Sequence, residues 1–291
     1  MDNLVQFFET MPSSYRSMLL VGGLVVFWGL EGVVPLFPNT YRRMHHAALN
    51  ALLTFFQLVI AVGFGAVIVK TVAYTSQHQF GLLYQVALPV WLRVLLGVLL
   101  LDFAGGYLIH WTEHKLSWMW RFHVIHHTDQ NVDVTTGLRH HPVETFFRLG
   151  SQWLAIGLGG IPIGVVFLYQ VLSIFFAQLT HANIRLPRGV DRWFSYVWVS
   201  PNMHKVHHHR QKPLTDRNYG NVFSIWDRMF GTFVEVDPDA LDYGIDSLTH
   251  PEDHDRLSRL LMMPFEKQRS ALGDSQASGS TSAPSSTDAV R

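Results

Sequence analysis

The sequence predicts an all-α integral membrane protein: three spanning helices and a helical hairpin, with a cytoplasmic helical cap rich in histidine. Hydrophobic residues make up 48% of the 291 positions and charged residues only 15%, which is too apolar for an ordinary soluble domain. Several apolar stretches are close to the roughly 20 residues that a helix needs to cross a bilayer. Histidine occurs 17 times, mostly in three tight groups, and this clustering is the main functional signal.

The N-terminal region, residues 1–109, supplies the three predicted spanning helices. Its apolar stretches cover about residues 18–37, 51–74 and 82–109. Each is long enough to cross the hydrocarbon core of a bilayer as a helix. We therefore treat this region as the membrane anchor.

The second region, residues 110–265, contains the histidine groups and one more apolar run, 146–180. The sequence GGIPIG interrupts this run, and its Gly and Pro predict a turn between two helices of a membrane hairpin. Residues 183–263 alternate between polar and aromatic, which is typical of a segment lying on the membrane surface. The tail, 266–291, is rich in Ser, Ala, Gly and Thr, so we expect it to be disordered.

Positive charge in the connections predicts the orientation. Arg42 and Arg43 lie between the first two apolar stretches, whereas TSQHQFG, between the second and third, has neither Lys nor Arg. By the positive-inside rule the first connection is cytoplasmic, so the third helix would bring His110 to the cytoplasmic side. A hairpin would return His181 to the same side, whereas a single crossing would separate it from the other histidines.

Three histidine boxes carry the candidate chemistry. They are HWTEH with His110 and His114, HVIHH with His123, His126 and His127, and HKVHH with His204, His207 and His208. Spacings of three and four residues place the rings of each box on one helical face. Imidazole is a common ligand of zinc, iron and copper, and the absence of cysteine excludes thiolate ligands. Eight histidines exceed the needs of one ion, so we predict two metals.

Asp102 is the other residue of note in the third apolar stretch. An ionisable side chain inside a membrane helix is costly, which suggests a function. It lies too far along the helix to contact His110, but it could orient a ligand imidazole from a neighbouring helix. The alternative is a plain ion pair with Arg93.

Three other functions would use some of the same residues. HWTEH also matches HxxEH, the inverted zinc-protease motif, with Glu113 as general base, but that hydrolase would leave the other boxes unused. A metal transporter would place its histidines along a path through the membrane rather than at its edge. A haem protein with two axial histidines needs one ligand per helix, not clusters. We therefore favour a site for small metal ions.

The motifs resemble the fatty acid hydroxylase and sterol desaturase superfamily of membrane-bound di-iron enzymes. The resemblance covers roughly residues 102–233 and includes RHHPVE at 139–144, LTHANI at 179–184 and NYGNVFSIWDRMFGTF at 218–233. Within the superfamily the chain looks most similar to bacterial sterol-desaturase-like proteins and to alkylglycerol monooxygenase. Hydroxylases and desaturases share these motifs, so both reactions stay open.

This resemblance implies a ligand set and a reaction. It makes the eight box histidines metal ligands and His181 a ninth, and it places His140, His141, Asn183 and Asn218 beside the ligands rather than among them. It implies two iron ions, with zinc an alternative in recombinant protein, and oxidation of an unactivated C–H bond of a fatty acyl, sterol or ether lipid by dioxygen.

The resemblance also implies an external electron donor of ferredoxin, rubredoxin or cytochrome type, since the sequence has no flavin, nicotinamide or iron–sulfur motif. Lys plus Arg equals Asp plus Glu at 22 each, so there is no basic excess for nucleic acid. The expected partners are thus a lipid, the membrane and the electron donor.

Overall fold

The computed structural model describes residues 2–266, and within them the chain is helical without any β-strand. The α-helices are α1 (Asp2–Thr10), α2 (Ser13–Val33), α3 (Arg43–Gln77), α4 (Val90–Asp102), α5 (Ile109–Lys115), α6 (Ser117–His127), α7 (Pro142–Gly159), α8 (Ile163–His181), α9 (Arg188–Phe194), α10 (Pro201–His207), α11 (Ile225–Met229), α12 (Pro251–Asp255) and α13 (Leu257–Met262). Short 3-10 helices cover Leu82–Tyr84, Val134–Leu138, Leu214–Asp216, Pro238–Ala240 and Met263–Phe265, and a π-helix covers Phe103–Leu108. The tail that we expected to be disordered lies, from residue 267 onward, outside the described residues.

By length and composition, four helical stretches of the described chain could cross a membrane. They are Ser13–Val33, Arg43–Tyr84, Val90–Lys115 and Ile163–His181. The first three overlap the predicted spanning helices, but the third begins at Val90 rather than near residue 82. The reason is Pro89, which is extended at φ −60° and ψ 148° and also disfavours a helical residue before it.

The predicted hairpin is present as α7 and α8. Gly160 ends α7 in the left-handed conformation, with φ at +67°, and Pro162 precedes α8. A Cβ atom at Gly160 would lie 2.6 Å from the carbonyl oxygen of Phe80 and 2.7 Å from the ring of Tyr84. Only glycine suits both this backbone and this close contact.

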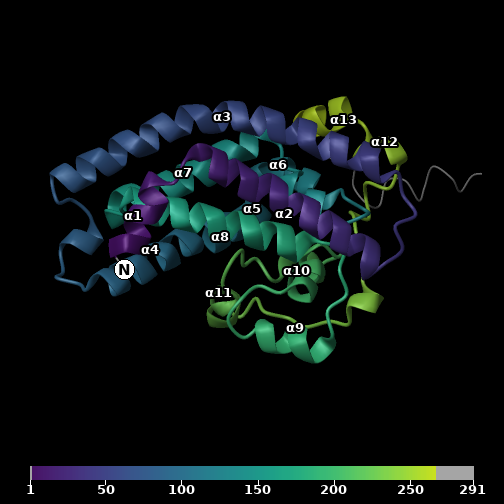
Figure 1. Cartoon of the computed structure of the whole chain (residues 1–291). Coiled ribbons are helices and arrows are strands. Elements are labelled where there is room, and N and C mark those ends of the chain that lie inside the picture. Colours follow the sequence, from purple (N-terminus) through teal and green to yellow (C-terminus); the bar gives the residue numbers. More distant parts are fainter. Residues whose placement is uncertain (1, 267–291) are drawn as a thin grey trace, which may run out of the picture.

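The long helices lie roughly along one direction (Figure 1), with α3 packed along α7, and α8 against α1, α2 and α4. Buried apolar side chains between α4, α7 and α8 form the main core. In contrast, the most apolar 18 residues of α2 are only 11% buried within the chain, and the same holds for the most apolar 18 residues of Arg43–Tyr84. Side chains such as Val25 and Val62 are 67% and 78% exposed, so this surface suits lipid rather than water.

The π-helix lies in the middle of the third spanning stretch, directly before His110. Its backbone departs from α-helical hydrogen bonding, and the Ala104 carbonyl accepts a hydrogen bond from the Ser151 hydroxyl of α7 at 2.8 Å. A Cβ at Gly105 would lie 2.4 Å from the side chain of Gln152, so glycine permits α7 to approach this closely. π-Helical turns are frequent at functional sites.

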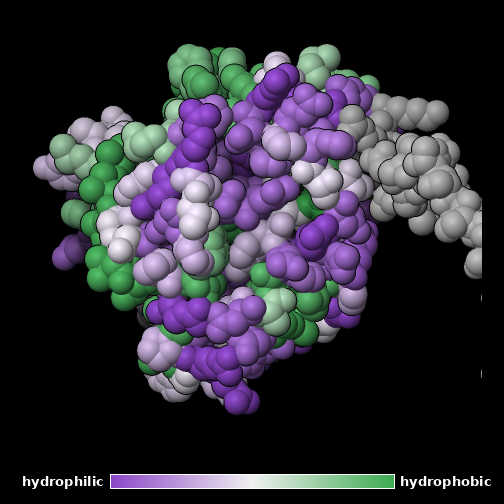
Figure 2. All heavy atoms as spheres, turned by 90° about the vertical axis from the view of Figure 1, so that its right-hand side faces the viewer, coloured by the Kyte–Doolittle hydropathy of each residue, from purple (hydrophilic) through white to green (hydrophobic). Residues whose placement is uncertain are grey.

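The cap formed by α9, α10 and α11 lies beneath the long helices in Figure 1, while α12 and α13 lie beside the start of α3. The end of the bundle on the right of that view is mostly polar, with apolar residues toward its edges (Figure 2). Trp193 and Tyr196, in and just after α9, are 78% and 58% exposed. Exposed aromatics beside Arg188 and Arg192 are typical of a membrane interface.

Candidate metal centre

The helices bring all nine candidate ligands together in two buried groups. The first group is His110, His114, His123, His127 and His207, and the second is His126, His181, His204 and His208. Within each group, one ring nitrogen per residue lies within 4.8 Å of all the others, and each group could hold a metal ion. We call these the five-histidine and the four-histidine group.

Each HxxHH box contributes to both groups, although its three rings lie side by side with centroids 4.9–5.6 Å apart. Residues four apart differ by only about 40° around a helix, whereas residues three apart differ by about 60° in the opposite sense. His123 and His127 therefore enter the five-histidine group and His126 the other. In α10, His204 and His208 stay together and His207 diverges. The two groups are thus joined through shared helices.

Six of the nine rings have a fixed orientation, because Nδ1 is hydrogen-bonded to an oxygen. The acceptors are the carbonyls of Tyr219 for His110, Arg139 for His126, Ala177 for His181 and Arg217 for His207, and the carboxylates of Asp216 for His114 and Glu144 for His123. A ring that donates through Nδ1 in its neutral form presents a lone pair at Nε2. This arrangement is the usual support of a metal-binding histidine.

The Nε2 atoms then face one another at distances that fit a metal site. His110 and His123 are 3.1 Å apart at Nε2, and His126 and His181 are 3.2 Å apart, although both members of each pair already donate through Nδ1. Two lone pairs facing each other this closely repel unless a cation lies between them. Metal–nitrogen bonds of about 2.1 Å at a right angle would separate two ligand atoms by about 3 Å. The donor set therefore fits a metal ion in each group.

Buried nitrogens without a partner support the same conclusion. Nε2 of His114, Nε2 of His207 and both ring nitrogens of His208 are shielded from solvent and make no hydrogen bond within the described chain. A buried polar atom without a partner costs free energy, so such atoms call for a ligand.

Burial also sets the charge of these rings. It lowers the pKa of His126, His127, His204, His207 and His208 well below the ordinary value of imidazole, and neighbouring imidazoles add to this effect. These rings are therefore neutral near pH 7, which is the form that binds metal.

Two carboxylates that orient candidate ligands were absent from the expected site residues. Glu144, in the first turn of α7, accepts hydrogen bonds through Oε1 from Nδ1 of His123 at 2.9 Å and from Nε of Arg148 at 2.8 Å. Asp216 binds Nδ1 of His114 at 3.1 Å, and this bond, with Lys212 and Lys115, holds the pKa of Asp216 below its usual value even though burial opposes the shift. Glu144 closes the motif RHHPVE and could have been suspected from it.

We expect replacement of Glu144 by Gln to weaken metal binding by about 10-fold to 100-fold, the usual cost of losing such a partner. Gln cannot keep the ionic acceptor for His123 and leaves the Arg148 guanidinium with less negative charge nearby. Titration of the purified protein with a divalent metal measures the effect. Glu9→Gln, on the exposed α1, is the control, and equal affinity of the Glu144 and Glu9 variants would contradict the role.

The structure corrects the role expected for Asp102. Its carboxylate contacts neither a histidine nor Arg93, and instead accepts hydrogen bonds from Val222 N, Phe223 N, Trp226 Nε1 and Tyr169 Oη. It thereby anchors the segment whose Tyr219 carbonyl holds His110. Its influence on the ligands is indirect.

The other residues expected beside the ligands differ in their positions. His140 is close, since its ring stacks on His126 with centroids 4.3 Å apart and its Nδ1 lies 2.9 Å from Glu144. His141 lies further from the two histidine groups, and its Nδ1 accepts a hydrogen bond from Val143 N at the start of α7. Asn218 binds the Met203 carbonyl and so supports α10. Asn183 binds only residues of the 36–39 loop through its side chain.

Glu113, the general base of the hydrolase alternative, points away from the centre of the histidines. Its Oε2 forms an ion pair with Arg148 at 2.7 Å and lies 3.6 Å from Nδ1 of His123, the ring nitrogen that faces outward. Moreover, His110 and His114 belong to a group with three further histidines. The geometry is therefore that of a supporting carboxylate.

The described chain thus combines apolar helices long enough to cross a membrane with two buried histidine groups that could each hold a metal ion, and the comparisons show which proteins share this region. Residues 94–232, which include all nine candidate ligands, match the fatty acid hydroxylase family model. No solved structure matches the chain significantly.

Curated relatives share the same region. The chain is 30% identical over 191 residues to the ornithine lipid hydroxylase OlsE of Rhizobium tropici, covering 65% of this chain and 56% of the relative. It is 33% identical over 161 residues to the alkylglycerol monooxygenase of Xenopus tropicalis, covering 55% of this chain and 33% of the relative. It is 29% identical over 210 residues to the fatty acid hydroxylase vlmA of a Lecanicillium species. The chain spans about half of the first and third of these relatives and a third of the second.

Proposed function

We propose that the protein is a membrane-bound, metal-dependent oxygenase that hydroxylates an unactivated C–H bond of a lipid. The observation that carries the proposal is the pair of buried histidine groups, with oriented Nε2 lone pairs, beside helices whose surface suits lipid. The relatives named above are hydroxylases and monooxygenases, and their names refer to ornithine lipids, alkylglycerols and fatty acids. Desaturation of the same lipid is the alternative outcome.

The two groups would each hold one iron ion. Two irons in such sites would supply the activation of dioxygen that breaks a strong C–H bond. The protein's own residues keep the imidazoles neutral, fix their orientation through Nδ1 and exclude water. The balanced reaction takes R–H, dioxygen, two electrons and two protons to R–OH and water.

The electrons would come from an external one-electron carrier, because the sequence has no flavin, nicotinamide or iron–sulfur motif. We further propose that residues 1–109 act as membrane anchor and residues 110–265 as catalytic region. The positive-inside rule, applied to Arg42 and Arg43, favours the cytoplasmic side for the histidines, where a soluble donor would reach the polar end of the bundle.

The test compares the lipids of a host that expresses the protein with those of a host that expresses the His126→Ala variant. We expect a lipid with one added oxygen, or one lacking two hydrogens, only in the first host and only under aerobic conditions. Glu113→Gln is included because the hydrolase alternative requires this carboxylate as general base. Lipid cleavage products that are lost in the Glu113 variant and are independent of oxygen would favour the hydrolase instead.

A further inference from the structure

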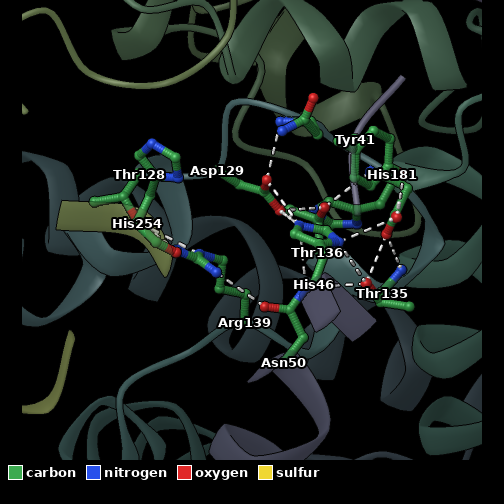
Figure 3. Close-up of polar contacts among 12 residues, drawn as sticks. Tyr41, His46, Asn50, Thr128, Asp129, Thr135, Thr136, Arg139, His181 and His254 are labelled. Atoms are coloured by element: carbon green, nitrogen blue, oxygen red, sulfur yellow. Dashed lines mark hydrogen bonds and ion pairs between the residues drawn. The ribbon is translucent and has the colours of Figure 1, made fainter. Parts of the chain in front are cut away.

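A buried polar network connects the start of α3 to the segment between α6 and α7 (Figure 3). His46 of α3 places Nε2 2.9 Å and 2.8 Å from the two carboxylate oxygens of Asp129, and Nδ1 3.2 Å from Oδ2 of Asp133. All three residues are buried. His46 belongs to none of the three histidine boxes, and as a helical residue that is only 7% exposed it is not an ordinary surface histidine.

From this network we infer that His46 is a positioning residue for the four-histidine group. The inference rests on the proposed function, because it concerns the metal that this group would hold. Both nitrogens of His46 face carboxylates, so the ring has no lone pair left for a metal and acts as a donor at both ends. Its effect must therefore pass through Asp129 and Asp133.

The two carboxylates shape the turn that follows the second box. Asp133 caps the 3-10 helix Val134–Leu138 by accepting from Thr135 N at 2.8 Å, and Asp129 accepts from the Thr136 hydroxyl at 2.7 Å. With a cationic ring between the two carboxylates, neither negative charge is buried alone, which would be costly. His46 thus fixes where this short helix lies.

The short helix in turn contacts two ligands of the four-histidine group. At its end, the Arg139 carbonyl lies 3.3 Å from Nδ1 of His126. Gly137 packs so closely on α8 that a Cβ atom there would lie 3.3 Å from Nδ1 of His181. Displacement of this helix would therefore move His126 and His181, whereas His110 and His114 are held by other segments.

Asn50 supports the same turn one helical turn after His46. Its amide nitrogen donates to the Thr135 hydroxyl at 2.9 Å, and its oxygen accepts from Nη1 of Arg139 at 3.0 Å. The fully buried Arg139 side chain also binds the Ile125 and His254 carbonyls. Both His46 and Asn50 lie outside residues 94–232, so α3 adds a support that the matched region lacks by itself.

The experiment measures metal content and cobalt(II) absorption spectra of the purified full chain in detergent. We expect wild type to bind two ions and His46→Leu to bind one of them about 10-fold to 100-fold more weakly, as for other lost supports of a metal ligand. The spectrum of His46→Leu should resemble that of His204→Ala, which alters the four-histidine group, and differ from that of His114→Ala.

Thr71→Val is the structural control, because it removes another hydrogen bond of α3, which Trp153 Nε1 donates to the Thr71 hydroxyl at 2.8 Å, far along the helix from His46. We expect it to keep both ions. His46→Gln is the milder second variant, since its amide can donate to one carboxylate but cannot balance two charges; we expect a smaller loss of affinity at the same group.

Folded His46 variants that bind two ions with unchanged affinity and spectrum would overturn the inference while leaving the proposed function intact. If His46→Leu does not fold, the affinity of His46→Gln decides in the same way. A wild-type protein that binds no second ion would instead count against the proposed function itself.

Discussion

Replacing His207 with Ala is expected to abolish oxygen-dependent lipid modification and to remove one metal ion per chain. His207 presents an unpartnered Nε2 to the five-histidine group while its Nδ1 lies 2.8 Å from the Arg217 carbonyl. Losing only the partner of a ligand already costs about 10-fold to 100-fold in affinity or activity, so losing the ligand should cost more than about 100-fold. Metal analysis and product formation by the purified variant measure both effects.

His209→Ala is the matched control for this prediction, because His209 lies two residues further on and belongs to neither group. Its Nδ1 accepts a hydrogen bond from Asp242 N at 3.3 Å, and its ring is half-buried. We expect this variant to retain both ions and most activity. Full activity of His207→Ala, or equal losses in the two variants, would contradict the ligand assignment.

Replacing Asp102 with Leu is expected to lower the free energy of unfolding by about 3 kcal/mol or more, because buried donors left without an acceptor cost about 1–3 kcal/mol each. The carboxylate accepts from two backbone amides, the Trp226 indole and the Tyr169 hydroxyl, inside an apolar bundle. Thermal unfolding of the purified protein in detergent measures the change.

The effect of Asp102→Leu should also reach the metal, since the anchored segment carries the Tyr219 carbonyl that holds His110. Asp102→Asn retains one acceptor oxygen, so we expect an intermediate loss of stability. If Asp102→Leu unfolds at the wild-type temperature and binds metal normally, the anchoring role is wrong.

Patterns that are local in the sequence predicted most of the long helices and most of the histidines of the candidate site. Apolar length predicted the long helices, GGIPIG predicted the turn at Gly160, and the histidine boxes contained eight of the nine residues that meet in the two groups. The division of each box between two groups is consistent with the spacing, because residues four and three apart turn away from the first residue in opposite senses around a helix, by about 40° and about 60°. The ninth histidine, His181, came from the resemblance.

Hydrogen-bond partners that are distant in the chain could not be predicted from the sequence. His114 meets Asp216 across 102 positions and His46 meets Asp129 across 83, and no local pattern marks either pair. Asp102 stood out in the sequence because a carboxylate in an apolar helix is costly. Its carboxylate, however, accepts a hydrogen bond from Val222 N, 120 residues further on, and the sequence gives no sign of that pairing. Burial and hydrogen-bond demand identify such residues only once the packing is known.

The origin of the oxygen atom in the product distinguishes an oxygenase from a hydrolase. The purified iron-loaded protein, a reduced one-electron carrier and membrane lipids are incubated under dioxygen enriched in a heavy oxygen isotope, and the lipids are analysed by mass spectrometry. We expect one heavy oxygen in the hydroxylated lipid and none in lipids incubated with His207→Ala. A lipid product whose new oxygen comes from water, or one formed without dioxygen, would contradict an oxygenase.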